Sequence, residues 1–574
     1  MLEIGAGVQD ITAYRHGIAM MGWARTENIV EGQATPLWAR AFVFKDPQTG
    51  RRQALVVAEV CFITYAIKQG VMQALARQHA HLGFTDETVL LTATHTHCGP
   101  GGYSHYVLYN VTSGGYVPEV LDVIVRGIVQ AIVQAERAAI PATTRVARGS
   151  FPTDQPVAFN RSLMAHNRNP EVARKFRPQE THLAIDREMT LLRFDGAQGE
   201  AIGCVNFFPL HPINVHNDHN VIHHDNKGIA ARLLEEELAR RTTAPVVAAF
   251  AQGAAGDVTP NFQRFPRLAM TRGVDPDDFK SARVNGQLQY ALALELYDKA
   301  AGIEPLGPAL DAALAYVDMS RVDVPADLGG GRTAPAAIGA RMLMGTEEGP
   351  GIPAVLGDLA QAAALLASTR TRVSALVEGS QAHARVFASH QLHGNKAIAI
   401  EPGDRRIFGW ADVAALPLPD WMDPSVAHLK DLARRDALGS QPWTPDILPV
   451  QVMVLGELAI AALPAEPTTQ AGRRLRATVA EALAPRGVKS ALLAGYANAY
   501  AGYVATPEEY DLQAYEGAST HFGRFTLPAY QSELRKLARA LCLPPEERRY
   551  DTGLRPRVFS REELAKRLHP GSKL

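Results

Sequence analysis

Short apolar runs alternate with segments of helical periodicity along the first half of the chain. Apolar, often β-branched runs predict buried strands over 54–60, 88–93, 202–208 and 246–251. Apolar positions at helical spacing predict helices over 66–81, 117–138 and 227–241. Strands joined by helices are typical of an α/β protein with at least one large sheet.

The second half is less regular. Gly, Pro and Ala dominate 323–353, which predicts a long loop or flap, and 359–386 has the pattern of a helix. Prolines and tryptophans predict an irregular connection over 417–449. A strand over 450–464, a helix over 472–484 and a charged surface tail or terminal helix over 546–574 complete the prediction.

Composition excludes several classes of protein. With 574 residues, the chain has room for about three or four domains of ordinary size. Its 58 basic and 59 acidic side chains give no general attraction to nucleic acid or an anionic membrane. There is no apolar run of transmembrane length. Four cysteines without a CxxC pair, and an N-terminus without a signal-like apolar segment, favour a reducing cytoplasm.

The histidines are concentrated in two windows, each of which follows a predicted strand. His95 and His97 lie two residues apart at a strand end, so they point the same way if strand geometry continues. Imidazole is a common metal ligand, and glycines at 99, 101 and 102 let the loop turn sharply. A polar loop with hydrogen-bonded histidines is the alternative interpretation.

The second window begins with His211, which also sits at a strand end. His216 and His219 are interpreted as solvated loop residues. Asp225 either orients a ligand histidine or caps the helix that starts near Lys227. Two strand-end histidines from separate segments suit a site assembled between loops.

A third candidate segment, over 251–261, places small residues after a buried strand. It lacks the phosphate-loop pattern, and Gly5-Ala6-Gly7 is too short for a dinucleotide fingerprint. The HExxH helix of metalloproteases and the GxSxG turn of α/β-hydrolases are also absent from the sequence.

Five further motifs occur in a fixed order, and together with the histidines they carry a resemblance. The chain resembles the neutral, non-lysosomal ceramidase family through colinear segments that cover nearly its whole length: THTHCGPGGY at 94–103, FNRS at 159–162, LHP at 210–212, GDVTPN at 256–261, GRRLR at 472–476, NAYAGY at 498–503 and YDLQAYEGAST at 510–520.

The resemblance implies a zinc amidohydrolase that cleaves ceramide to sphingosine and a fatty acid by attack of zinc-bound water. Carried over by motif, one zinc ion per chain is held by His95, His211, Glu466 and Tyr503. His97 and Arg161 match the substrate-contacting residues of the family, and Tyr503 also donates toward the developing oxyanion. Such a set leaves the metal open to water, as catalytic zinc requires.

The sequence departs from the family at Thr259, where serine is usual. A threonine keeps the hydroxyl but adds a methyl group that stiffens the side chain. A substrate-binding role for Thr259, with water as the nucleophile, is therefore the interpretation. Cleavage of another N-acyl amide, a non-catalytic lipid-binding homologue and covalent catalysis through Thr259 or His97 remain alternatives.

The resemblance also revises the domain organisation. It implies one large catalytic domain, with mixed β-sheets flanked by helices, over residues 1–545, followed by a C-terminal tail over 546–574 and no immunoglobulin-like domain. The expected partner is ceramide or a related amide, with the stretch 329–353 as a wall of its cleft. A transient contact with a membrane surface stays open.

Overall fold

A mixed sheet of eight strands forms the centre of the molecule. The computed structural model describes residues 1–242, 245–266, 268–378 and 381–574. Most neighbouring strands run antiparallel, whereas β5 pairs with β6, and β11 with β13, in parallel. The strand order is β13-β11-β10-β8-β1-β4-β5-β6, with bounds β1 Leu2–Asp10, β4 Trp38–Lys45, β5 Arg52–Ala58, β6 Val89–Ala93, β8 Ile140–Ser150, β10 Glu188–Gly196, β11 Ala201–Phe207 and β13 Val247–Ala251.

A second sheet of four strands packs against one face of the first. Its order is β15-β19-β20-β22, with bounds β15 Leu310–Asp318, β19 Ile447–Leu455, β20 Leu458–Ala462 and β22 Ser490–Ala494. Alternation along β4 explains the contact, because Phe42 and Phe44 point toward Met453 and Ile460 of the second sheet. The residues between them point to the opposite face.

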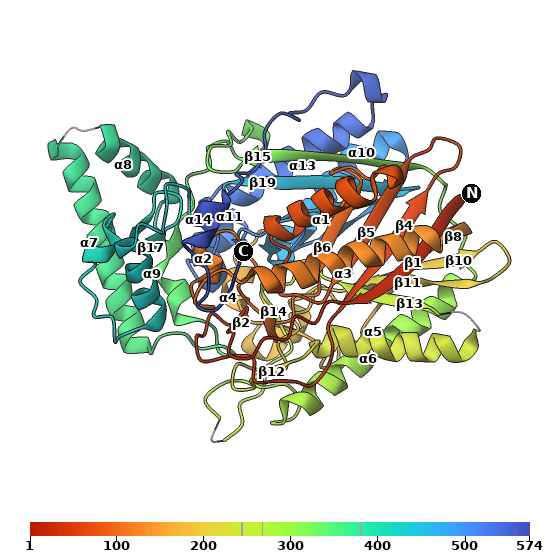
Figure 1. The fold of residues 1–574 in the computed structure, drawn as a ribbon, viewed down its shortest axis with the longest axis horizontal. Helices are drawn as coiled ribbons and strands as arrows, with labels where there is room; N and C mark the ends of the chain where they lie inside the picture. The colour runs from red at the N-terminus through yellow and green to blue at the C-terminus, as the bar shows by residue number, and fades with distance from the viewer. Residues whose placement is uncertain (243–244, 267, 379–380) are drawn as a thin grey trace.

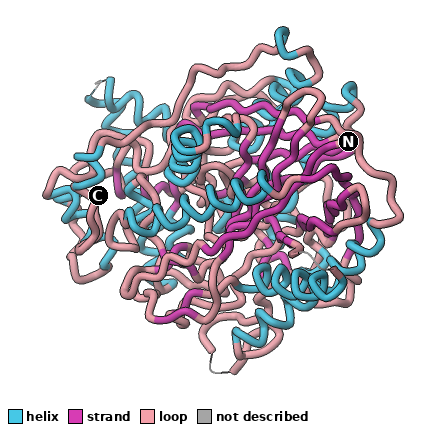
Figure 2. Tube along the Cα trace, turned by 45° about the vertical axis from the view of Figure 1, so that its right-hand side comes forward, coloured by secondary structure: helices cyan, strands magenta, loops and turns pink. Residues whose placement is uncertain are grey.

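Helices cover the two outer faces. The outer face of the large sheet carries α1 (Tyr65–Gln78), α3 (Pro118–Arg137), α5 (Asp225–Arg241) and α6 (Asp278–Ala300). The small sheet is covered by α10 (Thr469–Leu483) and α13 (Thr526–Leu541). The result is a four-layer arrangement with strands in the middle and helices outside (Figures 1 and 2). The predicted α/β class is confirmed.

Gly5 and Gly7 of β1 allow α3 to pack closely against the large sheet. A methyl group at Gly7 would lie 2.2 Å from the carbonyl oxygen of Ala131, and one at Gly5 would lie 2.0 Å from that of Ala135. The backbone of α3 therefore rests directly on β1, which is possible only without side chains at these two positions.

Several predicted elements form as expected, and others differ. Helix α3 and strands β5, β6, β11 and β13 match their predicted ranges closely. The single strand predicted over 450–464 is wrong: Gly456, at a φ of 58°, turns the chain into the hairpin of β19 and β20. The irregular connection contains a helix, α9 (Pro424–Arg434), whose first turn Asp423 caps.

The stretch 323–353 is mostly irregular, as predicted, with only short elements such as η4 (Ala340–Met344). The helix predicted over 359–386 corresponds to α7 (Ala354–Glu378) and α8 (Gln381–His393), and its residues 379–380 lie outside the described residues. Both helices lie at one end of the molecule, away from the large sheet (Figure 1).

The C-terminal segment returns to the body of the molecule. It contains a short helix, α14 (Arg561–Ala565), and buries Phe559 and Leu564 in the core beneath α3. Backbone hydrogen bonds join Tyr116 to Arg567 and His569. Among the described residues, no helix is long and apolar enough to cross a membrane.

Candidate metal centre

The ends of two parallel strand pairs bring the histidine windows together. His95 lies in the loop after β6 and His211 in the loop after β11. These two strands run in opposite directions in the sheet, but their loops converge, and the two imidazole rings lie with centroids 4.7 Å apart. His95 has a φ of 77°, in the left-handed region, so strand geometry stops before it. The rings of His95 and His97 nevertheless meet, with their Nε2 atoms 3.1 Å apart. The predicted convergence is found, but a strained turn produces it.

Backbone carbonyls fix the orientation of both strand-end histidines. Nδ1 of His95 lies 2.6 Å from the carbonyl oxygen of Cys61, and Nδ1 of His211 lies 3.0 Å from that of Val258. A carbonyl oxygen only accepts hydrogen bonds, so each Nδ1 carries the hydrogen. In the neutral ring, Nε2 then presents a lone pair, as in a metal-ligating histidine.

Glu466 completes the cluster from the short strand β21 (Glu466–Pro467). Its Oε2 lies 3.5 Å from Nε2 of His95 and 3.3 Å from Nε2 of His211. All three side chains are buried, and within the described part of the chain Nε2 of His211 makes no hydrogen bond. Nε2 of His211 and Oε2 of Glu466 therefore face each other as two acceptors in a dry interior, and a cation between them would remove the repulsion.

The electrostatics agree with that requirement. Burial alone raises the pKa of Glu466, but His95 and His211 hold it well below its usual range. Burial and nearby Arg161 lower the pKa of His211 to about 4, so this imidazole is neutral at pH 7. Two imidazoles and a carboxylate, with ligand atoms within 4.8 Å of one another, fit a zinc ion.

Two tyrosines that the sequence interpretation missed hold the carboxylate. The hydroxyl of Tyr496 donates to Oε2 of Glu466 over 3.2 Å, and the hydroxyl of Tyr500 donates to Oε1. The ring of Tyr496 also lies against His95, with centroids 4.1 Å apart. Their signal was the tyrosine-rich stretch before Tyr503, of which only the last tyrosine was assigned a role.

Tyr503 lies beside Glu466 because their strands pair in parallel. It begins β23 (Tyr503–Val504), in register with Glu466. Its hydroxyl accepts a hydrogen bond from Nη2 of Arg161 over 3.1 Å. Burial, and next the charge of Glu466, raise the pKa of Tyr503 well above its usual value, so the phenol keeps its proton. Its role as a metal ligand stays a prediction.

Arg161 is held by two buried carboxylates. Nη1 donates to Glu348 over 2.8 Å and Nε donates to Glu516 over 3.0 Å, while Nη2 also donates to the carbonyl oxygen of Gly256 over 2.7 Å. The short strand β9 (Phe159–Asn160) places Arg161 there by pairing with β14 (Val258–Thr259).

His97 is neutral and has a free ring nitrogen. Burial, and next the neighbouring imidazoles of His95 and His211, lower the pKa of His97 well below its usual value. Among the described residues, its Nδ1 has no hydrogen-bond partner. The ring of Trp23 packs edge-on against it, with centroids 5.1 Å apart.

Thr259 is buried. It follows Val258, whose carbonyl oxygen accepts hydrogen bonds from the backbone nitrogen and from Nδ1 of His211, so Thr259 lies close to the cluster. Its hydroxyl oxygen accepts a hydrogen bond from the backbone nitrogen of Asn261 over 3.1 Å. That contact braces a turn of the loop. It does not pair the hydroxyl with a histidine base.

Two interpretations of the second histidine window are wrong. His216 is fully buried rather than solvated, and its Nδ1 lies 3.0 Å from Asp278. His219 is half-buried and faces the same carboxylate at 3.2 Å. Asp225 accepts hydrogen bonds from the backbone of Asn214 and Val215 and from that of Asn226, so it shapes the loop after His211.

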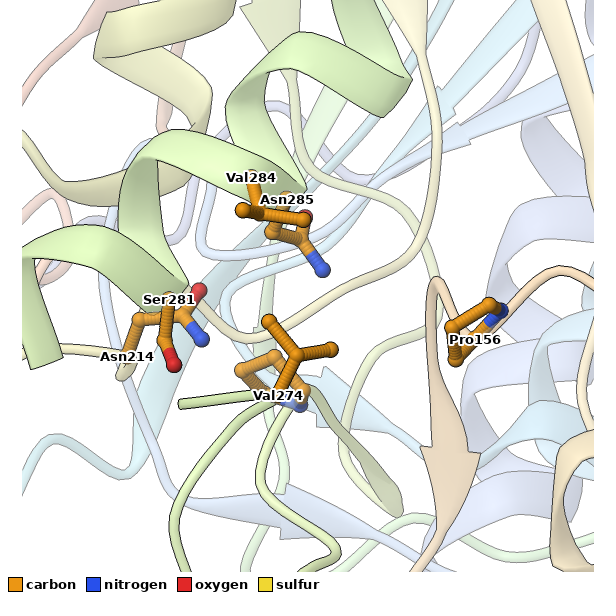
Figure 3. A pocket seen from close by; sticks show the side chains of 7 residues that line it. Pro156, Asn214, Val274, Ser281, Val284 and Asn285 are labelled. Carbon is orange, nitrogen blue, oxygen red and sulfur yellow. The ribbon is translucent and has the colours of Figure 1, made fainter. Parts of the chain in front are cut away.

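A small hollow near this loop is separate from the cluster (Figure 3). Asn214 and Pro260 line it together with Ser281, Val284 and Asn285 of α6. The side chain of Asn285 is engaged by the carbonyl oxygen of Val157. The histidines and Glu466 do not line this hollow, so it is a gap in packing around α6 rather than part of the centre.

Comparison with known proteins decides the family. The model of the neutral/alkaline non-lysosomal ceramidase N-terminal domain matches residues 2–413 and 432–532. The chain belongs to this ceramidase family. Membership makes it a ceramidase-like hydrolase, as the colinear motifs predicted.

Named members of the ceramidase family match over most of the chain. Neutral ceramidase B of Dictyostelium discoideum and the neutral ceramidase of Pseudomonas aeruginosa are each 32% identical, over 94% of this chain and 72% of theirs. The crystal structure of the Pseudomonas aeruginosa enzyme superposes with a TM-score of 0.76 at 30% identity, covering 97% of this chain and 76% of that one. A structure described as ceramidase complexed with C2 gives 0.77 at 31% identity, covering 97% and 78%.

Proposed function

We propose that this ceramidase-family protein is a zinc-dependent amidohydrolase that cleaves the N-acyl bond of ceramide to sphingosine and a fatty acid. The observation that carries the proposal is the convergence of two oriented imidazole lone pairs, from His95 and His211, on the buried carboxylate of Glu466. The matching relatives are named neutral ceramidases, which supports ceramide as the substrate.

In the proposed site, His95, His211 and Glu466 hold the ion, with Tyr503 as the fourth ligand. A bound zinc ion polarises an amide carbonyl and lowers the pKa of a water molecule toward 7. Tyr496 and Tyr500 keep the carboxylate in position through their hydroxyl groups. The carbonyls of Cys61 and Val258 keep both imidazoles in the tautomer that can bind.

Arg161 and Tyr503 are proposed to bind the reacting carbonyl group. The hydroxyl oxygen of Tyr503 accepts from Arg161, so its own hydrogen is available to the amide oxygen of the substrate. Donors directed at a developing oxyanion contribute a few kcal/mol to catalysis. The charge of Arg161 strengthens that donor.

His97 is the proposed proton carrier. Its neutral ring and unpartnered Nδ1 suit it to accept a proton from the attacking water and return it to the amide nitrogen as the C–N bond breaks. The water oxygen then stays with the acyl carbon, which leaves as the fatty acid. Thr259, with its hydroxyl on the backbone of Asn261, is assigned to loop geometry and substrate contact.

Exposed apolar side chains on α7 support a transient contact with lipid. Val355, Leu359 and Leu366 are each more than half exposed, at 73%, 62% and 66%. A substrate that resides in membranes would be met at such a surface.

The test is hydrolysis of a fluorescent ceramide by the purified protein, with and without a zinc chelator. We expect turnover that chelation abolishes and added zinc restores. A sample with one zinc per chain that leaves ceramide intact would overturn the proposed substrate and favour another N-acyl amide. Full activity in the chelator would overturn the zinc mechanism.

A further inference from the structure

Glu348 is a buried carboxylate in an otherwise accessible segment. It lies in residues 345–351, between η4 and α7, and is 1% exposed. Its neighbour Glu347 is 70% exposed and pairs with Arg264 on the surface. A carboxylate is withdrawn from water in this way only if it gains a strong partner.

That partner is Arg161, which Glu348 contacts through Oε1. The same guanidinium binds Glu516, and Glu516 also accepts from the hydroxyl of Ser162. One buried cation thus serves two buried carboxylates. If Glu348 moves away, Arg161 still pairs with Glu516. The contact of Arg161 with Glu348 can therefore break without leaving a buried arginine that lacks a counter-charge.

The segment 345–351 also lies over the metal centre. Gly349 packs on the ring of Trp23, where a methyl group would lie 2.6 Å from the ring. Trp23 in turn packs on His97 and stacks on His216 at 5.6 Å. Arg25 donates to the carbonyl oxygens of Pro350 and Gly351 and fixes the other end of the segment.

The centre beneath it is closed to solvent. The side chains of His95, His211 and Glu466 are at most 3% exposed. A substrate amide cannot reach them until part of the chain moves. Residues 345–351 form a compact hairpin, because Gly345 bridges to Pro350 and the backbone nitrogen of Gly351 donates to the carbonyl oxygen of Met344, so the segment can move as one unit.

We propose that Glu348 is a positioning residue: residues 345–351 form a lid over the metal centre, and closure of the lid places Glu348 on Arg161 and so orients that guanidinium toward Tyr503. The open lid admits substrate, and the closed lid completes the site. The assignment of Arg161 to the reaction rests on the proposed function, whereas the lid itself does not.

The experiment compares Glu348→Gln with the matched control Glu347→Gln in the zinc-loaded full chain. Hydrogen exchange measured by mass spectrometry reports on the lid without any substrate. We expect the amides of 345–351 to exchange about tenfold faster in Glu348→Gln, since the charge that holds the lid is lost. Zinc loss to a chelator should accelerate as well. Glu347→Gln should match the wild type in both measurements.

Kinetics with ceramide test the positioning role. We expect Glu348→Gln to lower kcat by about tenfold with little change in KM, because Arg161 is misplaced after the substrate binds. Glu348→Ala, which removes the acceptor as well as the charge, should lose more. If Glu348→Gln exchanges and releases zinc like the wild type, the lid is overturned. Faster exchange with unchanged kcat would overturn the positioning role.

The two proposals fail in different ways. If the wild type leaves ceramide intact but Glu348→Gln still exchanges faster than the wild type, the proposed function is wrong and the lid proposal is supported. If Glu348→Gln does not fold, Arg25→Met loosens the same segment from its other end and leaves Glu348 in place. Its lid amides should then exchange about threefold faster or more. Unchanged exchange in that variant counts against the lid.

Discussion

Nε2 of His211 and Oε2 of Glu466 lie 3.3 Å apart without a hydrogen bond between them. The imidazole hydrogen is on Nδ1, where the carbonyl of Val258 accepts it. An acceptor therefore faces an acceptor in a buried site, which is the arrangement that a bound cation resolves.

Removing His211 should remove the metal. We expect His211→Ala to lose bound zinc and ceramide hydrolysis together, because only one imidazole and one carboxylate of the buried cluster remain. Elemental analysis of the purified protein measures the zinc content. His428→Ala, on α9, is the control and should keep one zinc per chain. A His211→Ala protein that retains stoichiometric zinc contradicts the assignment.

Tyr500 should tune the affinity for zinc. Tyr500→Phe deletes the hydroxyl that donates to Oε1 of Glu466, and we expect about tenfold weaker zinc binding. Competition with a chromophoric chelator measures the change. Tyr530→Phe is the matched control, because the buried hydroxyl of Tyr530 has no hydrogen-bond partner within the described residues. Equal affinity in the two variants would show that Tyr500 does not hold the carboxylate.

Glu509 should make stability depend on pH. Burial, and next the charge of Asp257, raise its pKa to about 7 in the folded protein. Between about pH 4.5 and 7 the folded state therefore binds more protons than the unfolded state, and the free energy of unfolding falls as pH rises. Glu509→Gln should reduce that fall.

Chemical denaturation at several pH values measures the effect. The half-exposed Glu508, which pairs with Arg474, offers the control Glu508→Gln and should leave the pH dependence unchanged. A Glu509→Gln profile parallel to that of the wild type would refute the assignment.

Variants of Thr259 distinguish attack by water from covalent catalysis through the threonine hydroxyl. Thr259→Ser keeps the acceptor for Asn261 and should retain activity, whereas Thr259→Val should lose about tenfold because a buried backbone nitrogen is left without a partner. Steady-state hydrolysis measures both variants. An acyl group trapped on residue 259, or complete loss of activity in Thr259→Val, would favour covalent catalysis.

Gly7 should be intolerant of any side chain. Gly7→Ala forces a methyl group against the backbone of α3, and we expect a loss of about 1–3 kcal/mol in the free energy of unfolding. Gly307→Ala, where the nearest atom would lie 3.4 Å away, is the control. Thermal unfolding compares the two. Equal stability would mean that α3 can move off β1.

The elements that were predicted correctly are those whose start, end and apolar face can be recognised within a short stretch of sequence. Helix α3 was found to within a residue because Pro118 and a continuous apolar face define it. The hairpin at Gly456 was missed because both of its strands are buried and read as one apolar run. Helix α9 was missed although Asp423 and Pro424 form a helix start, since the surrounding prolines masked its short amphipathic pattern.

The site was predictable in its residues but not in its contacts. Motif order named His95, His211 and Glu466, while the link between Tyr500 and Glu466 depends on how distant segments pack. His216 was misread for the same reason: its loop lies beneath Trp23 and Asp278, and neither is near it in sequence. Nothing in the local sequence distinguishes the buried Glu348 from the exposed Glu347.

The separation of the ligands along the chain also sets the order of events during synthesis. His95 emerges early from the ribosome, but Glu466 reaches it only after β20 has joined the second sheet and the chain has turned into β21. Tyr503 follows later still. Nascent chains that end between residues 211 and 466 contain both histidines without their carboxylate, so in the proposed zinc site metal capture would follow synthesis of β19 and β20.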